Sequence, residues 1–217
     1  MNKPLILTKT TAYVKQTLEN EGSGHDWWHI HRVLQNARLI GKTEKVDMFV
    51  VELAALLHDI ADWKMHDGDQ EIGAKTARKW LEGLKVDSRT IKHVYEIIAT
   101  SSYKGARVTD HMSTREGEVV QDADRLDAIG AIGIARTFTY GGHKGSPIYD
   151  PTTPPVMHTT AEAYYNGRTH TINHFYEKLL LLKDLMNTQT AKKLARARHT
   201  HMEKFLKQFY KEWEGEA

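Results

Sequence analysis

The 217-residue chain contains no cysteine. Disulfide bonds and thiolate metal sites are therefore excluded, and any bound metal must be held by nitrogen and oxygen ligands. No apolar run is long enough to cross a membrane, and the N-terminal residues MNKPLILTKT carry no signal-peptide pattern, which predicts a cytoplasmic protein without a membrane partner. The formal net charge is only +2, so the composition does not call for nucleic acid as a partner.

Proline is also scarce, and most of the five prolines lie in one loop, residues 141–155. Strand-type alternation is missing, whereas apolar residues recur every three or four positions along most of the chain. These patterns predict an all-α fold, a single-domain helical bundle over residues 1–217. The expected helices span residues 5–19, 27–40, 48 onward through the core stretch, 72–84, 88–98, 118–138 as one long helix, 161–185 and 190–213. Thr8 or Thr10, Asp26 and Ser88 are the expected N-caps.

The stretch Met48–Lys64 is the most apolar part of the chain and ends in polar residues. A helix that is apolar on nearly every side is buried in a protein of this size. This helix is followed directly by His58 and Asp59, with Asp62 three residues later. Burying an imidazole and carboxylates is costly unless their polar atoms are compensated, either by a metal ion or by a His–Asp hydrogen bond without metal.

Thirteen histidines are present, and several of them precede the core stretch. His25 and His29 would share one face of a helix, although His25 lies before the expected cap and its direction is open. His31 lies about 200° round the helix from His29, so these two cannot face one point.

Three carboxylates crowd one turn of the expected long helix: Asp122, Asp124 and Asp127. Asp122 and Asp124 lie about 200° apart, so only one of them can face a buried ion. Asp124 has the most apolar sequence neighbours of the three. The alternative for Asp124 is a structural ion pair with Arg125 or with a lysine of a neighbouring helix.

Three segments together resemble the HD-domain superfamily of metal-dependent phosphohydrolases: HDWWHIHRV, LLHDIAD and QDADRLDAIGAIGIARTF. The order of a histidine, a His-Asp pair and a distant aspartate is typical of that superfamily. The resemblance covers residues 20–160, the expected metal-binding core. The C-terminal helices, about 161–214, are similar to those of a small bacterial subgroup that includes nucleoside-triphosphate pyrophosphohydrolases.

The resemblance implies that His29, His58, Asp59 and Asp124 bind one divalent metal ion. His29 is favoured over its neighbouring histidines because the superfamily pattern His-x-x-Arg-Val matches His29, Arg32 and Val33. Two imidazoles and two carboxylates suit manganese, magnesium or iron and leave room for water and a phosphate oxygen. The sequence does not say which ion is native.

Asp62 and Lys64 are the predicted catalytic residues. Asp62 is placed to transfer a proton, and an acidic residue at this offset has a similar role in nucleotidase branches of the superfamily. Lys64, Lys104 and Arg125 are candidate phosphate-binding cations. The alternatives are an Asp62–Lys64 pair and ordinary structural charges.

The expected substrate is a small phosphorylated molecule, most plausibly a nucleoside triphosphate cleaved to monophosphate and pyrophosphate. The alternatives are a nucleoside monophosphatase and a non-catalytic nucleotide or RNA sensor that uses the basic C-terminal helix. A solvated basic face is favoured over nucleic-acid contact for that helix, and a homodimer is compatible with the sequence.

Overall fold

The computed structural model describes residues 2–19, 24, 26–61, 69, 71–101, 111–157, 160 and 170–216. Every regular element in these ranges is a helix, so the predicted all-α class is confirmed. Among the described residues, no helix is long and apolar enough to cross a membrane.

Two compact units make up the chain: Met1–Tyr103 with Asp110–Asp124, and Lys104–Thr109 with Arg125–Ala217. The first contains α1 (Lys3–Thr17), α2 (Trp27–Gly41), α3 (Met48–Leu57), α4 (Ile72–Gly83), α5 (Ser88–Thr100) and most of α6 (Arg115–Asp127). The second contains α7 (Gly130–His143), α9 (Thr171–Glu177), the 3-10 helix η2 (Leu179–Leu185) and α10 (Gln189–Trp213). The single-domain prediction is not tested by this division and stays a prediction.

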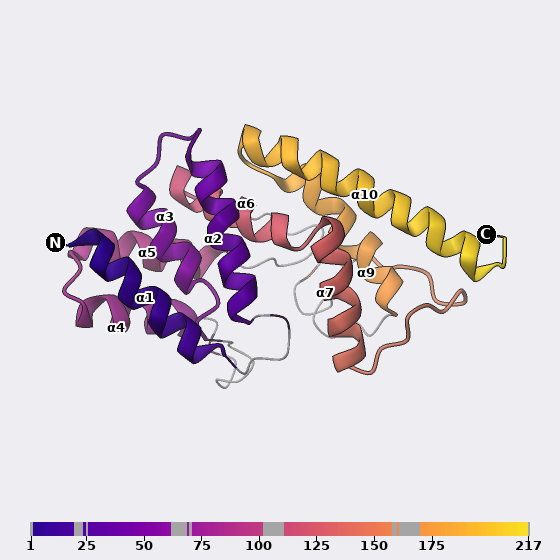
Figure 1. Cartoon of the computed structure of the whole chain (residues 1–217), viewed down its shortest axis with the longest axis horizontal. Coiled ribbons are helices and arrows are strands. Elements are labelled where there is room, and N and C mark those ends of the chain that lie inside the picture. Colours follow the sequence, from indigo (N-terminus) through magenta and orange to yellow (C-terminus); the bar gives the residue numbers. More distant parts are fainter. Residues whose placement is uncertain are drawn as a thin grey trace. The chain divides into compact units, whose positions relative to one another are not determined.

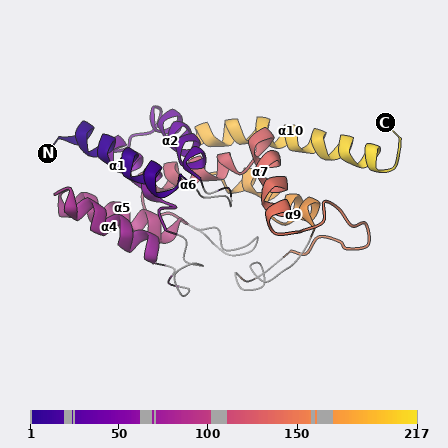
Figure 2. The same cartoon turned by 60° about the horizontal axis from the view of Figure 1, so that its bottom comes forward.

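Helix α3 is the core of the first unit (Figure 1). Its buried residues are Phe49, Val50, Val51, Leu53, Ala54, Ala55, Leu56 and Leu57. Each large side chain among them stabilises the fold by roughly 1.5–3 kcal/mol on burial. α3 packs against α1, α2 and α5, and α4 lies beside α5 (Figures 1 and 2). The predicted core helix is therefore central to the unit that contains the candidate site.

Aspartate and asparagine side chains cap several helices of the first unit. Asp26 Oδ1 accepts a hydrogen bond from the backbone N–H of His29 at 2.8 Å, as the sequence predicted. The cap of α5 is Asp87 and not Ser88, because the Asp87 carboxylate accepts from both the N–H and the hydroxyl of Thr90. The cap of α1 is Asn2 and not Thr8 or Thr10, so this helix begins earlier than predicted.

The predicted single helix over 118–138 is wrong. The chain forms α6 and α7, which are separated at Ala128 and Ile129. Gly130 has φ +78°, a backbone conformation that side chains with a Cβ rarely adopt. The side of Gly130 where a side chain would begin also lies against Arg198, whose Cβ and Cγ would be 3.0 Å from an added Cβ. The glycine thus permits both the turn and the close packing of α10.

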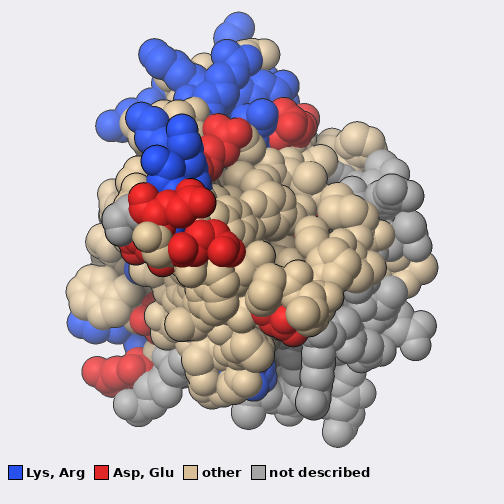
Figure 3. Space-filling model, turned by 90° about the vertical axis from the view of Figure 1, so that its right-hand side faces the viewer, with Lys and Arg blue, Asp and Glu red and all other residues tan. Residues whose placement is uncertain are grey.

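In the second unit α10 packs against α7 and η2. Its buried residues are Ala191, Ala195, Met202 and Leu206. Its exposed cations are Lys193, Arg196, Lys204, Lys207 and Lys211. In the view of Figure 3, lysine and arginine side chains gather at the top, with carboxylates directly below them. The predicted amphipathic helix with an exposed basic face is confirmed. The helix predicted over 161–185 falls partly outside the described residues, and its described part is α9 followed by η2.

Candidate metal centre

His58 stands at the point where the core helix ends. α3 stops at Leu57, and His58 is its C-cap, so His58 and Asp59 lie in a turn and not on the helix. His58 Nδ1 lies 3.0 Å from the backbone carbonyl oxygen of Ala55. A carbonyl oxygen can only accept a hydrogen bond. Nδ1 of His58 therefore carries the proton and donates a hydrogen bond to the Ala55 carbonyl. In the neutral ring Nε2 then has a free lone pair, the state in which an imidazole binds metal.

His29 is brought to the same point by the first turn of α2. Its side chain is fully buried, and its Nε2 lies 3.2 Å from His58 Nε2. The Asp59 Oδ2 atom lies 3.3 Å from His29 Nε2 and 3.5 Å from His58 Nε2. Suitable ligand atoms of these three residues all lie within 4.8 Å of one another, which makes them a group that could hold a metal ion.

Asp124 approaches the same two imidazoles from α6. Its Oδ1 lies 3.5 Å from His29 Nε2 and 3.8 Å from His58 Nε2. The neighbouring residue Ala123 is tied to α2, because the side-chain amide of Asn36 donates a hydrogen bond to the Ala123 carbonyl at 3.2 Å. Both Asn36 and Ala123 are buried, so this bond fixes α6 against α2 next to Asp124.

The ligand atoms of His29, His58 and Asp59 suit a divalent ion in chemistry and spacing, and Asp124 approaches both imidazoles. Bonds of about 2.1 Å at right angles place neighbouring ligand atoms about 3.0 Å apart. The measured separations of 3.2 to 3.8 Å are close to that value. The histidines are buried, whereas the Asp59 and Asp124 side chains are 29% and 41% exposed, so the site is open to solvent on its carboxylate side. Without a metal, a hydrogen bond from His29 Nε2 to His58 Nε2 would satisfy both ring nitrogens. That bond alone gives no reason for the carboxylates of Asp59 and Asp124 to lie beside the two rings.

The other two aspartates of α6 are buried. Asp127 pairs with Arg136, whose Nη1 donates to Asp127 Oδ2 at 2.8 Å. Asp122 is fully buried. Asp124, the carboxylate that the resemblance favoured, lies within 3.8 Å of both imidazoles.

Most of the predicted catalytic and phosphate-binding residues cannot be placed at the site. Asp62, Lys64 and Lys104 lie outside the described residues, as does His25. Arg125 is buried, and its guanidinium donates a hydrogen bond to the carbonyl of Leu185 at the end of η2. Its role as a substrate ligand stays a prediction.

Two residues near the site were missed by the sequence reasoning. Asn36 lies seven residues after His29 and therefore on the same face of α2, a polar residue among apolar ones. That spacing could have identified it. Trp28 immediately precedes His29 and is strongly exposed, which the sequence alone did not reveal.

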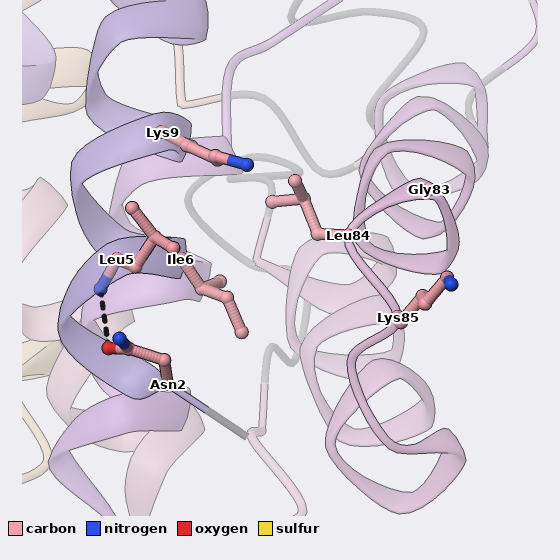
Figure 4. A pocket seen from close by; sticks show the side chains of 7 residues that line it. All are labelled: Asn2, Leu5, Ile6, Lys9, Gly83, Leu84 and Lys85. Carbon is pink, nitrogen blue, oxygen red and sulfur yellow. Dashed lines mark hydrogen bonds between the residues drawn. The ribbon is translucent and has the colours of Figure 1, made fainter.

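A separate hollow of about 370 Å³ lies between α1 and the turn from α4 to α5 (Figure 4). Leu5, Ile6 and Leu84 line it, and Lys9 reaches across it toward Leu84. None of the described residues that line it has a carboxylate or an imidazole.

Residues 27–129 match the HD domain family, and this range contains all four residues of the metal centre. The chain is 40% identical to the uncharacterized protein YpgQ of Bacillus subtilis over 205 residues, which are 94% of this chain and 92% of YpgQ.

Several solved structures are similar to this chain over nearly its whole length. An HD-superfamily hydrolase from Bacillus thuringiensis is 48% identical, with a TM-score of 0.76 over 98% of this chain and 99% of that one. A protein from Lactobacillus plantarum is 39% identical, with a TM-score of 0.85 over 97% and 98% of the two chains. The crystal structure of YpgQ in complex with ADP aligns with a TM-score of 0.76 at 36% identity, over 97% of this chain and all of that one.

Proposed function

Because the chain belongs to the HD-domain superfamily of hydrolases, we propose that it is a metal-dependent phosphohydrolase that acts on a nucleotide. The observation that carries the proposal is the convergence of His29, His58, Asp59 and Asp124 on one point. The ADP complex of the relative YpgQ supports a nucleotide ligand. Within this class we favour cleavage of a nucleoside triphosphate to monophosphate and pyrophosphate.

His29, His58, Asp59 and Asp124 would hold the ion through two imidazole nitrogens and two carboxylate oxygens. A bound divalent ion supplies positive charge to a phosphate oxygen and makes water more acidic and a better nucleophile. The chain prepares for this in two ways. The Ala55 carbonyl keeps the proton of His58 on Nδ1, and the buried imidazoles keep solvent from one side of the site.

The remaining roles are assigned to the acidic and basic residues that the sequence singled out. We assign to Asp62 the proton transfer from water or to the leaving oxygen. Lys64 and Lys104 would neutralise phosphate charge during hydrolysis. The hydrogen bond from Arg125 to Leu185 favours a structural contribution from Arg125 in addition to any contact with substrate.

A panel of nucleoside tri-, di- and monophosphates tests the proposal. The purified protein is supplied with manganese, and products are identified by phosphorus NMR. We expect pyrophosphate and a nucleoside monophosphate from at least one triphosphate, and a loss of at least about 100-fold in kcat/KM for His58→Ala, because both a ligand and its orienting bond are removed. His143→Ala, which removes an exposed histidine from α7, is the matched control and should retain activity.

The same experiment separates the alternatives. Nucleoside and orthophosphate as products would support a monophosphatase. Tight nucleotide binding without any turnover would support a sensor and overturn the hydrolase. Turnover that His58→Ala leaves intact would place the chemistry somewhere else on the chain.

A further inference from the structure

Helix α10, the long helix that ends near the C-terminus, is much more positively charged than the rest of the chain (Figure 1). Its 25 residues contain seven lysines and arginines and only two glutamates, which gives the helix a formal net charge of +5. The whole chain carries +2, so the residues outside α10 together carry −3. A positive charge concentrated on one helix attracts anionic partners to that helix.

Five of these cations are exposed and form one row along α10, here named the basic row: Lys193, Arg196, Lys204, Lys207 and Lys211. At 100° per residue they lie within about 80° of arc around the helix. At 1.5 Å per residue the row extends over about 27 Å. The charges therefore form a narrow, straight stripe on one side of the helix.

The basic row is not neutralised by carboxylates of the described residues. None of the ion pairs between described residues includes a member of the row, whereas cations on α2, α4, α5, α6 and α7 form such pairs. The two glutamates of α10 contact other side chains. Glu203 Oε1 lies 3.4 Å from His199 Nε2, and Glu212 Oε1 accepts a hydrogen bond from the Gln208 amide at 2.7 Å. The sequence alone predicted a solvated basic face, and the structure adds that its cations have no acidic partner among the described residues.

Such a row works against the stability of the helix that carries it. Like charges three or four residues apart on one helix face repel each other. The row contains three such pairs: Lys193–Arg196, Lys204–Lys207 and Lys207–Lys211. A polyanion along the row would neutralise this repulsion, and phosphates that are neutralised in this way release their own counterions.

The residues around the row favour a phosphate backbone over a lipid surface or unstacked bases. The exposed residues between the cations are small or polar, namely Ala197, Thr200, His201 and Gln208. Helices that lie on membranes insert large apolar side chains, and single strands are held by aromatic side chains on which bases stack. Trp213 is exposed, but it lies about 200° round the helix from Lys211 and so faces away from the row.

We propose that the basic row binds the phosphate backbone of double-stranded DNA without reading its sequence. A DNA duplex is stiff and carries one charge per about 1.7 Å of its axis, so a straight row of cations meets several phosphates without bending the DNA. Lysine and arginine supply hydrogen-bond donors and no acceptors, which suits phosphate oxygens, whereas RNA duplexes are also recognised through their 2′-hydroxyl groups. The inference does not rest on the proposed hydrolase, because the four metal-centre residues belong to the other compact unit.

Fluorescence anisotropy with a labelled DNA duplex of about 20 base pairs tests the proposal, with the full chain titrated at about 50 to 200 mM KCl. We expect a Kd of roughly 1–100 μM near physiological salt. The logarithm of the association constant should fall with the logarithm of the salt concentration with a slope of about −4 to −5, because each of five neutralised phosphates contributes about −0.9. A second duplex of unrelated sequence should bind equally well.

Two double variants with the same loss of charge locate the binding surface. Lys204→Ala combined with Lys207→Ala should raise Kd by at least about tenfold at the lowest salt and bring the slope about 2 closer to zero, because two phosphate contacts are lost. Alanine suits exposed helix positions, so this variant should remain folded, which urea unfolding verifies. Lys79→Ala combined with Lys92→Ala removes exposed charges from α4 and α5 and should leave Kd and slope unchanged. Nucleotide hydrolysis should be the same in all three proteins.

Equal losses of DNA affinity in the two double variants would overturn the proposal, because net charge alone would then explain the binding. Absence of binding at the lowest salt would overturn it as well. Tighter binding of an RNA duplex, of a single strand or of phosphatidylcholine–phosphatidylserine vesicles would assign the row to a different partner and contradict its role on DNA. A protein that binds DNA as expected and hydrolyses no nucleotide would contradict the proposed hydrolase while supporting the role of the basic row.

Discussion

His58 uses its two ring nitrogens for different purposes. Nδ1 donates to the Ala55 carbonyl one turn earlier in the core helix, and Nε2 faces His29, Asp59 and Asp124. A hydrogen bond to the backbone fixes both the tautomer and the orientation of the ring. The backbone of the core helix thus holds His58 in the tautomer and orientation in which Nε2 can bind a metal.

Asp124→Ala should lower the affinity for manganese by roughly 100-fold or more and abolish hydrolysis, because it removes one of two carboxylates that offset the charge of the ion. Metal content is measured by elemental analysis after dialysis, and affinity by calorimetry. Asp184→Ala, which removes a carboxylate exposed on η2, is the control and should bind manganese as wild type does. Retention of full metal affinity by Asp124→Ala would show that α6 does not contribute a ligand.

His174 gives the protein a pH dependence of its own. Burial, together with the nearby Lys178 charge, lowers the pKa of His174 to about 3. The unfolded chain, with a histidine pKa of about 6.5, binds this proton first as the pH falls, so the free energy of unfolding decreases between about pH 6.5 and 3. The slope is at most about 1.4 kcal/mol per pH unit, and less where water reaches the partly accessible ring. His174→Gln should remove this part of the slope in urea titrations at several pH values. An unchanged slope would contradict it.

Residue types limited the candidate ligands to histidine and carboxylate, because the chain contains no cysteine. The choice among His25, His29 and His31, or among three aspartates, came from the superfamily pattern. Trp28 could not be predicted, because exposure depends on what the tertiary structure leaves uncovered. Asn36 could have been predicted, because its spacing from His29 in the sequence places both residues on the same face of the helix.

At the scale of elements, the metal centre depends on the fit between α2, α3 and α6. Asn36 is the buried polar link between α2 and α6. Asn36→Ala should lower the affinity for manganese by roughly tenfold and the free energy of unfolding by about 1 kcal/mol, because Asp124 loses its fixed position and a buried hydrogen bond is lost. Calorimetry and urea unfolding measure the two effects. Gln35→Ala, on the exposed face of the same helix, should change neither. A loss of stability without any loss of metal affinity would limit Asn36 to packing.

The break between α6 and α7 depends on Gly130. Gly130→Ala should lower the free energy of unfolding by about 1–2 kcal/mol, because alanine is strained at positive φ and its Cβ would press on the Arg198 side chain. Gly142→Ala in the same helix has open space around the added Cβ and should be neutral or raise stability by about 0.5–1 kcal/mol. Thermal and urea unfolding distinguish the pair. Equal effects of the two substitutions would show that the conformation of Gly130 is not required.

Helices were predictable where apolar periodicity and a capping residue agree, as for α2 with Asp26. The long helix over 118–138 was not, because its sequence remains helical in character across Ala128 and Ile129. Only the packing of Arg198 against Gly130 shows why the chain must turn there. Caps were shifted by a residue or more where several polar side chains compete, as at Asp87 and Ser88.

At the scale of the whole molecule, the chain forms two compact units, and one of the boundaries between them falls inside α6, between Asp124 and Arg125. A boundary within a helix has no signal in composition, since linkers are usually recognised by proline, glycine and polar residues. All four residues of the metal centre belong to the first unit. The chemistry that we propose therefore has its metal ligands within one unit.

The central claim is that four side chains, distant in sequence, hold one divalent ion. Diffraction from manganese-loaded crystals, recorded at a wavelength where manganese scatters anomalously, locates the ion directly. We predict one anomalous peak, at bonding distance of about 2.0–2.3 Å from His29 Nε2, His58 Nε2 and carboxylate oxygens of Asp59 and Asp124. A manganese-loaded crystal with its peak elsewhere, or with none among these four residues, would contradict the account.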